Sequence, residues 1–141
     1  MKRFLLSLAL VFAFSFAAFA GVQDFGAYTL DVPEGWTAEQ DGSTVNILKN
    51  DNSALLSITY DDAEGMSAAD LAKAFSEQFG GSAPANDGGN YTFEFKNANG
   101  VASNGIVAVD PDSGKFVLFV ITGAENAPED ISRMMDSLKD K

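Results

Sequence analysis

The sequence contains no cysteine and no histidine among its 141 residues. Their absence excludes disulfide frameworks, thiolate or imidazole metal sites, haem ligation by either side chain, and the Ser-His-Asp and Cys-His arrangements of nucleophilic catalysis. Proline is scarce, with four residues, and no Pro/Ser-rich linker or internal repeat divides the chain. With 46% apolar and 21% charged positions, the composition is typical of one compact domain rather than of a disordered or fibrous chain.

Long hydrophobic runs are lacking after the N-terminal segment, which has the three parts of a cleaved secretory signal. Lys2 and Arg3 precede an apolar stretch over 4–16, and the small residues of 18–20 flank a cleavage point before Gly21. An uncleaved anchor is the alternative, but the apolar stretch reaches only about 17 residues and a membrane span needs about 20. We expect residues 1–20 to be removed and the mature protein to be periplasmic or secreted. No cysteine is present to carry a lipid anchor.

Basic residues are few. Removing Lys2 and Arg3 leaves seven of them against twenty acids, so the net charge moves from −11 to −13. This acidity disfavours binding to nucleic acid or to anionic membrane surfaces, whereas basic proteins and cations remain possible partners. The alternative is that the charge only keeps the protein soluble.

The mature chain, residues 21–141, is predicted to form a single α+β domain. Alternating apolar residues predict strands over 25–32, 43–49 and 54–60, joined as a three-stranded meander. An amphipathic helix follows, with Ser67 as N-cap and Gly80-Gly81 at its end. The interval 80–89 is predicted to be a loop.

The second half of the chain is predicted to have the same order of elements, three strands followed by a helix. Strands are predicted over 91–96, 101–109 and 115–122. They are followed by a helix that is opened by the residues 126–130, has Ile131, Met134, Met135 and Leu138 on one face, and has Lys139 and Lys141 near its end. The run 116–121 is apolar on both faces, which favours a central strand with helical layers on both sides, a two-layer sandwich being the alternative. The predicted order is βββαβββα.

A family resemblance agrees with this order. The string Tyr28-Thr29-Leu30-Asp31-Val32-Pro33-Glu34-Gly35-Trp36, followed by the elements above, resembles the PsbP-like superfamily. Its members include the extrinsic photosystem subunit, a nuclear-import factor and small periplasmic DcrB-type bacterial proteins. This chain most resembles the DcrB-type proteins in its general character. The resemblance implies an α/β/α sandwich around an antiparallel sheet of about six strands, and a non-enzymatic interaction or accessory role. It carries over no functional residue, because none of the family's functional residues matches a position here.

One group of acids is a candidate metal site. Asp61, Asp62 and Glu64 form the densest carboxylate cluster, which would bind a divalent cation such as calcium weakly through oxygen ligands. The alternative is a solvated loop with acids near a helix N-terminus. The segment 110–114 begins like a calcium loop, but Ile121 stands where the bidentate acid is expected, so a turn between two strands is the favoured interpretation.

The remaining candidate residues are interpreted as parts of the hydrophobic core rather than as functional side chains. Trp36 after the Pro-Glu-Gly turn is interpreted as core rather than as an exposed binding aromatic, and Met134 and Met135 as helix packing rather than a partner surface. No pair of acids is singled out for general acid–base catalysis.

The sequence therefore predicts a protein that is not an enzyme, without catalytic residues or a cofactor. We expect it to act in the cell envelope by binding an unknown protein partner. A small-ligand or divalent-cation binding protein is the alternative.

Overall fold

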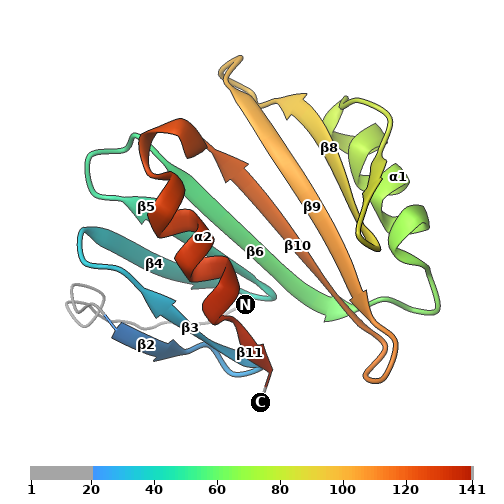
Figure 1. The fold of residues 1–141 in the computed structure, drawn as a ribbon, viewed down its shortest axis with the longest axis horizontal. Helices are drawn as coiled ribbons and strands as arrows, with labels where there is room; N and C mark the ends of the chain where they lie inside the picture. The colour runs from blue at the N-terminus through green and yellow to red at the C-terminus, as the bar shows by residue number, and fades with distance from the viewer. Residues whose placement is uncertain (1–20, 141) are drawn as a thin grey trace.

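The computed structural model describes residues 21–140, so the predicted signal peptide lies outside the described residues. Two helices and a run of strands follow one another along the chain (Figure 1). In order, the elements are β2 (Gly21–Asp24), β3 (Tyr28–Val32), β4 (Trp36–Asp41), β5 (Thr44–Lys49), β6 (Leu55–Asp62), α1 (Ala68–Phe79), β7 (Ala85–Asp87), β8 (Asn90–Lys96), β9 (Ala102–Asp110), β10 (Lys115–Thr122), the 3₁₀ turn η3 (Ala124–Asn126), α2 (Pro128–Ser137) and β11 (Lys139–Asp140). Within 21–140, none of the helices has the length and apolar character needed to span a membrane.

A seven-stranded antiparallel sheet forms the centre of the molecule, in the order β4-β5-β6-β10-β9-β8-β7. Strand β10 lies in the middle, paired with β6 on one side and β9 on the other. The predicted central position of 116–121 is therefore confirmed. Alternate residues of β10 supply both faces: Phe116 and Leu118 point to one side and Ile121 to the other.

The two helices lie on opposite faces of this sheet and at opposite ends of it (Figure 1). Helix α2, together with a small sheet of order β11-β3-β2, covers one face over β4, β5 and β6. Helix α1 covers the other face over β8 and β9. The α+β class with helices on both faces is thus confirmed, but each helical layer covers only half of its face.

The predicted meander is wrong in one strand. The segment expected as its first strand, 25–32, forms β3 in the small sheet, and the strand that pairs with β5 is β4. The physical reason is the turn at Pro33–Gly35, where Gly35 has φ 91° and redirects the chain from one layer to the other. Strand β4 was missed because only Trp36 and Ala38 are apolar along it.

Helix α1 begins and ends as the sequence predicts. Ser67 accepts a hydrogen bond from the Asp70 amide at 3.1 Å and the Asp70 carboxylate accepts one from the Ser67 amide at 3.4 Å, which forms a capping box. Gly80 closes the helix in the left-handed conformation at φ 71°. The predicted loop 80–89 contains the short edge strand β7, which was missed because it is brief, polar and fully exposed.

Candidate functional site

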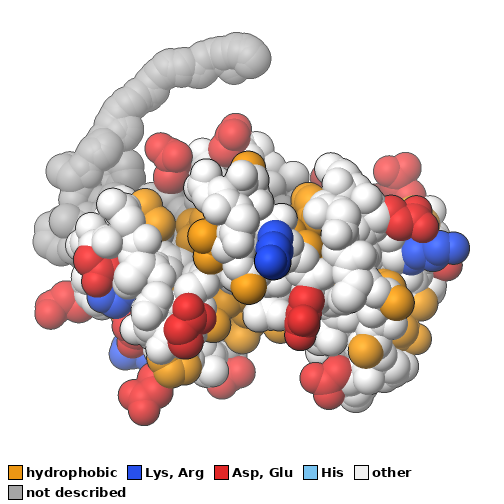
Figure 2. Space-filling view, turned by 90° about the horizontal axis from the view of Figure 1, so that it is seen from above, with side chains coloured by type: hydrophobic (Ala, Val, Ile, Leu, Met, Phe, Trp, Pro, Cys, Tyr) orange, Lys and Arg blue, Asp and Glu red, His pale blue; other side chains and the backbone are white. Residues whose placement is uncertain are grey.

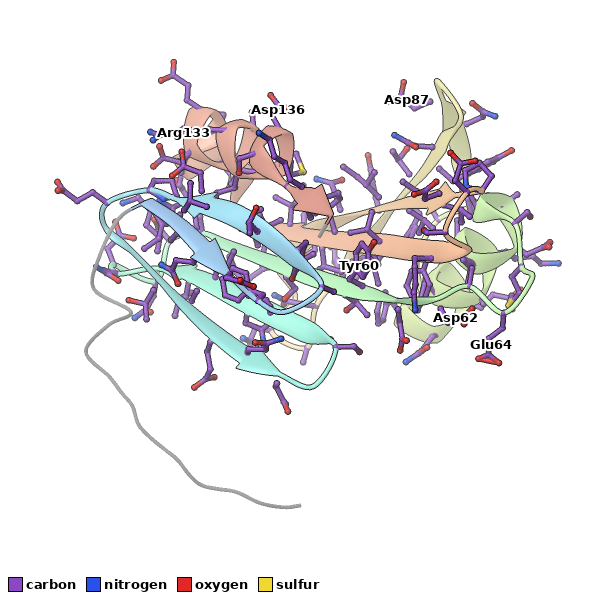
Figure 3. All side chains as sticks on the ribbon, turned by 90° about the horizontal axis from the view of Figure 1, so that it is seen from below. Tyr60, Asp62, Glu64, Asp87, Arg133 and Asp136 are labelled. Atoms are coloured by element: carbon purple, nitrogen blue, oxygen red, sulfur yellow. The ribbon has the colours of Figure 1, made fainter. Side chains whose placement is uncertain are left out.

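The three acids of the predicted metal site lie at the end of β6 and in the loop that follows. Asp61 Oδ1 accepts a hydrogen bond from the Asp62 amide, and Asp62 Oδ1 accepts one from the Glu64 amide, each at 2.8 Å. All three residues are exposed, and Figure 3 labels Asp62 and Glu64 near the start of α1. The described residues contain no group of three acidic side chains placed to hold a metal ion. The proposed cation site at these acids therefore stays a prediction.

The segment 110–114 is the turn between β9 and β10, as predicted. The Gly114 amide donates to the Asp110 carbonyl at 2.9 Å. The Asp110 carboxylate accepts from the Asp112 amide at 2.9 Å and from the Ser113 hydroxyl at 3.2 Å. These bonds stabilise the turn itself.

Trp36 belongs to the core, which confirms its interpretation from sequence. It is 2% exposed, and its indole Nε1 donates a hydrogen bond to Asp130 Oδ2 at 3.0 Å. This bond joins the first residue of β4 to the first turn of α2. Met134 of α2 is fully buried in the same core, and Met135 packs against its margin.

The strongest candidate for a binding surface is the part of the sheet that α2 leaves uncovered. On the face that α2 partly covers, register places Tyr60, Ile106, Ala108, Val117 and Phe119 side by side on β6, β9 and β10. All five are only partly buried, and Ile106, Val117 and Phe119 pack against the margin of the core beneath α2. We call these residues the open half-face. Figure 2 shows the surface hollowed between the two halves of the molecule, with hydrophobic side chains inside the hollow.

Two elements rise on either side of the open half-face. Helix α2 stands on one side and the β7–β8 hairpin on the other. Figure 3 places Asp136 of α2 and Asp87 of β7 on these two sides, with Tyr60 between them on the sheet. Both aspartates are exposed. The site is therefore an apolar floor between two walls that each carry a carboxylate.

A second concavity lies between α1 and the loop that follows it. This groove of about 440 Å³ is lined by Ala69, Lys73, Ser76, Glu77, Gly81, Ser82, Ala83, Pro84 and Tyr91. Its wall is held in place because the buried Ser76 hydroxyl donates to the Ser82 carbonyl, and the Ser82 amide donates to the Glu94 carbonyl of β8 at 2.8 Å. The groove is small and open, and its lining mixes methyl groups with one lysine and one glutamate.

Sequence reasoning missed the open half-face. The apolar character of β10 on both sides was interpreted as full coverage by helices, but Val117 and Phe119 are only partly buried. The site could have been predicted by comparing the lengths of the two helices with the width of the sheet. Two helices of ten and twelve residues are too short to cover both faces of a sheet that is seven strands wide.

The architecture defines a mixed α+β domain in which an antiparallel sheet carries one helix on each face. No family model matches the sequence, and no curated protein matches it. Among solved structures, the chain is similar to the solution structure of cyanobacterial PsbP (CyanoP) from Synechocystis sp. PCC 6803, with a TM-score of 0.55 and 13% sequence identity. The match covers 87% of this chain and 94% of that one. At this identity the likeness shows the fold alone, and that fold is PsbP-like.

Proposed function

We propose that this chain is a small, non-enzymatic accessory domain that is exported to the cell envelope and works by binding another protein. The observation that carries the proposal is the PsbP-like fold. The sequence string 28–36 predicts this fold, and the structural likeness to CyanoP supports it. A kinship with small periplasmic DcrB-type proteins is part of the same proposal. The lack of histidine and cysteine in the sequence is consistent with a role that does not involve catalysis.

Export is tested separately from binding. Cells that express the full chain are fractionated, and the recovered protein is sequenced from its N-terminus. We expect an envelope or secreted protein that begins at Gly21, because the small residues Ala18 and Ala20 precede it. Protein that stays in the cytoplasm with Met1 or Lys2 at its N-terminus contradicts this part of the proposal.

Partner binding is tested by photo-cross-linking in intact cells. A photoreactive amino acid is placed in turn at exposed positions distributed over the surface, for example Thr37, Lys73, Asp87, Asn99 and Asp136. Adducts of defined mass with another protein at some positions and not at others support the proposal. A folded, exported protein that yields no adduct at any position overturns it.

A small-molecule binding role is the second candidate, favoured by the groove between α1 and residues 81–84. A fragment screen followed by amide chemical shifts tests it. Shifts confined to Lys73, Ser82 and Tyr91 would favour this role, and shifts scattered over the surface would oppose it.

A further inference from the structure

The open half-face differs from the rest of its own sheet face in how completely it is covered. Along β10, Ile121 is 6% exposed beneath the α2 layer, whereas Phe119 and Val117 on the same face are only partly buried. On β6, Leu56 and Ile58 are fully buried, whereas Tyr60 is not. Residues with core chemistry therefore continue beyond the edge of the layer that covers the core.

Acidic groups surround this apolar floor. On β6, β7, β8, β9 and β10, four carboxylates and two lysines share this face; the acids are Asp62, Asp87, Glu94 and Asp110, and the lysines Lys96 and Lys115. Helix α2 adds the exposed carboxylate of Asp136, while the exposed Arg133, one turn before it, is paired with Asp31. The two ion pairs formed among residues 21–140 are Lys49–Asp51 and Arg133–Asp31, and both lie elsewhere. The floor is therefore apolar and its surroundings carry excess negative charge.

We propose that the open half-face binds a cationic segment of a partner protein that carries apolar side chains, with Asp87 and Asp136 meeting its lysines or arginines. The inference rests on the proposed function and specifies its surface and partner chemistry. Charge complementarity selects this occupant. A second copy of the processed chain, residues 21–141, would bring another net charge of −13 to an already acidic surface, and an anionic lipid surface would be repelled in the same way.

The first experiment uses defined peptides. The protein recovered from the envelope or medium of cells that express the full chain is titrated with three fluorescent peptides of equal length. In these peptides lysine alternates with leucine, lysine with serine, or glutamate with leucine. We expect the lysine–leucine peptide to bind, with amide shifts at Ile106, Val117 and Phe119 and with affinity that falls as salt rises. Failure of this peptide to bind overturns the inference, as does equal binding of the glutamate–leucine peptide.

A matched pair of charge variants separates the local site from net charge. The double variant Asp87→Asn with Asp136→Asn removes one carboxylate from each wall. The control Glu39→Gln with Asp41→Asn removes two exposed carboxylates from β4, on the far side of the molecule. Both change the net charge equally. We expect Kd to rise about three- to tenfold for the first and less than about twofold for the second. Equal weakening in both variants overturns the inference.

The apolar part is tested by Val117→Thr, which replaces one methyl group by a hydroxyl at nearly the same side-chain shape and so makes the floor more polar. Peptide affinity should fall while the circular dichroism spectrum stays that of the parent. Unchanged affinity opposes the inference. Cellular adducts at positions away from Asp87 and Asp136 would leave the proposed function standing and overturn this surface. An absence of any adduct would remove the proposed function even if the peptide binds.

Discussion

The two halves of the molecule are built differently around one sheet. The α2 half has a large, tightly closed aliphatic core in which Leu30, Ile47, Leu56, Ile58 and Met134 are fully buried. The α1 half has a smaller core rich in phenylalanine, and most of its rings are only partly buried, including Phe75, Phe79 and Phe95. The α2 half is covered by a helix and a second sheet, and the α1 half by a single helix. Two covering elements exclude water from a sheet face far better than one.

The largest expected difference comes from the same truncation in each half. Leu56→Ala should lower the free energy of unfolding by about 3–5 kcal/mol, because the fully buried site cannot collapse around the cavity. Leu71→Ala in α1, where the side chain is 7% exposed, should cost only about 2–3 kcal/mol. Urea unfolding followed by Trp36 fluorescence and circular dichroism measures both. An equal or reversed order would show that the two cores are equally well packed.

Glycine replacements give the next largest difference. In the α2 half, a Cβ at Gly123 would lie 2.1 Å from the Ser53 carbonyl oxygen, at a φ of 71° that disfavours side chains. In the α1 half, a Cβ at Gly105 would lie 2.3 Å from the Phe93 ring. Backbone is harder to displace than a ring, so we expect Gly123→Ala to cost about 2–4 kcal/mol and Gly105→Ala about 1–3 kcal/mol. Thermal and urea unfolding of the two variants side by side test the order.

A pH titration sharpens the comparison, because Tyr28 is buried in the α2 half. Burial raises the pKa of its phenol from 10.0 to about 12. The folded state therefore favours the neutral phenol. The raised pKa contributes about 2–3 kcal/mol to the free energy of unfolding. This contribution is fully present below pH 10 and is lost as the pH rises to about 12. Urea unfolding at several alkaline pH values should show a steeper loss for the parent than for Tyr28→Phe. Parallel losses would contradict the assignment.

The smallest effect concerns calcium and the acids that precede α1. Asp61 and Asp62 use carboxylate oxygens to accept neighbouring amides, so we expect about 1 mM calcium to raise the Tm by no more than about 2 °C. Thermal scans with calcium, magnesium and chelator measure the shift. A larger, calcium-specific rise that disappears in Asp61→Asn, Asp62→Asn and Glu64→Gln together would establish a cation site in this loop.

The elements that the sequence predicts well are those with a strong local pattern. Leu71, Phe75 and Phe79 recur at helical spacing after the cap Ser67, and α1 forms as expected. The strands that were missed are short or polar, such as β2, β7 and β11, and their pairing depends on distant partners. Local alternation predicted a strand over 25–32, of which Tyr28–Val32 forms β3, but which sheet this strand joins is decided by tertiary contacts.

Helix lengths could have predicted that part of the sheet stays open, but the local sequence pattern could not show which residues lie there. Val117 and Phe119 have the same chemistry as the buried Ile121, two to four positions further along β10. Their exposure depends on where the α2 layer stops, and that is a property of the assembled molecule. The acid cluster 61–64, by contrast, was visible in the sequence, but adjacency along the chain does not make carboxylates converge in space.

The small sheet has a consequence for the order of folding. Asp24 of β2 and Lys139 of β11 both pair with Thr29, although they lie about 115 positions apart in the chain. Loop closure over such a distance is entropically costly, so we expect this sheet to form after the local hairpins of the large sheet. The proposed export would benefit from such a late step, because the small sheet forms only when both distant segments are on the same side of the membrane.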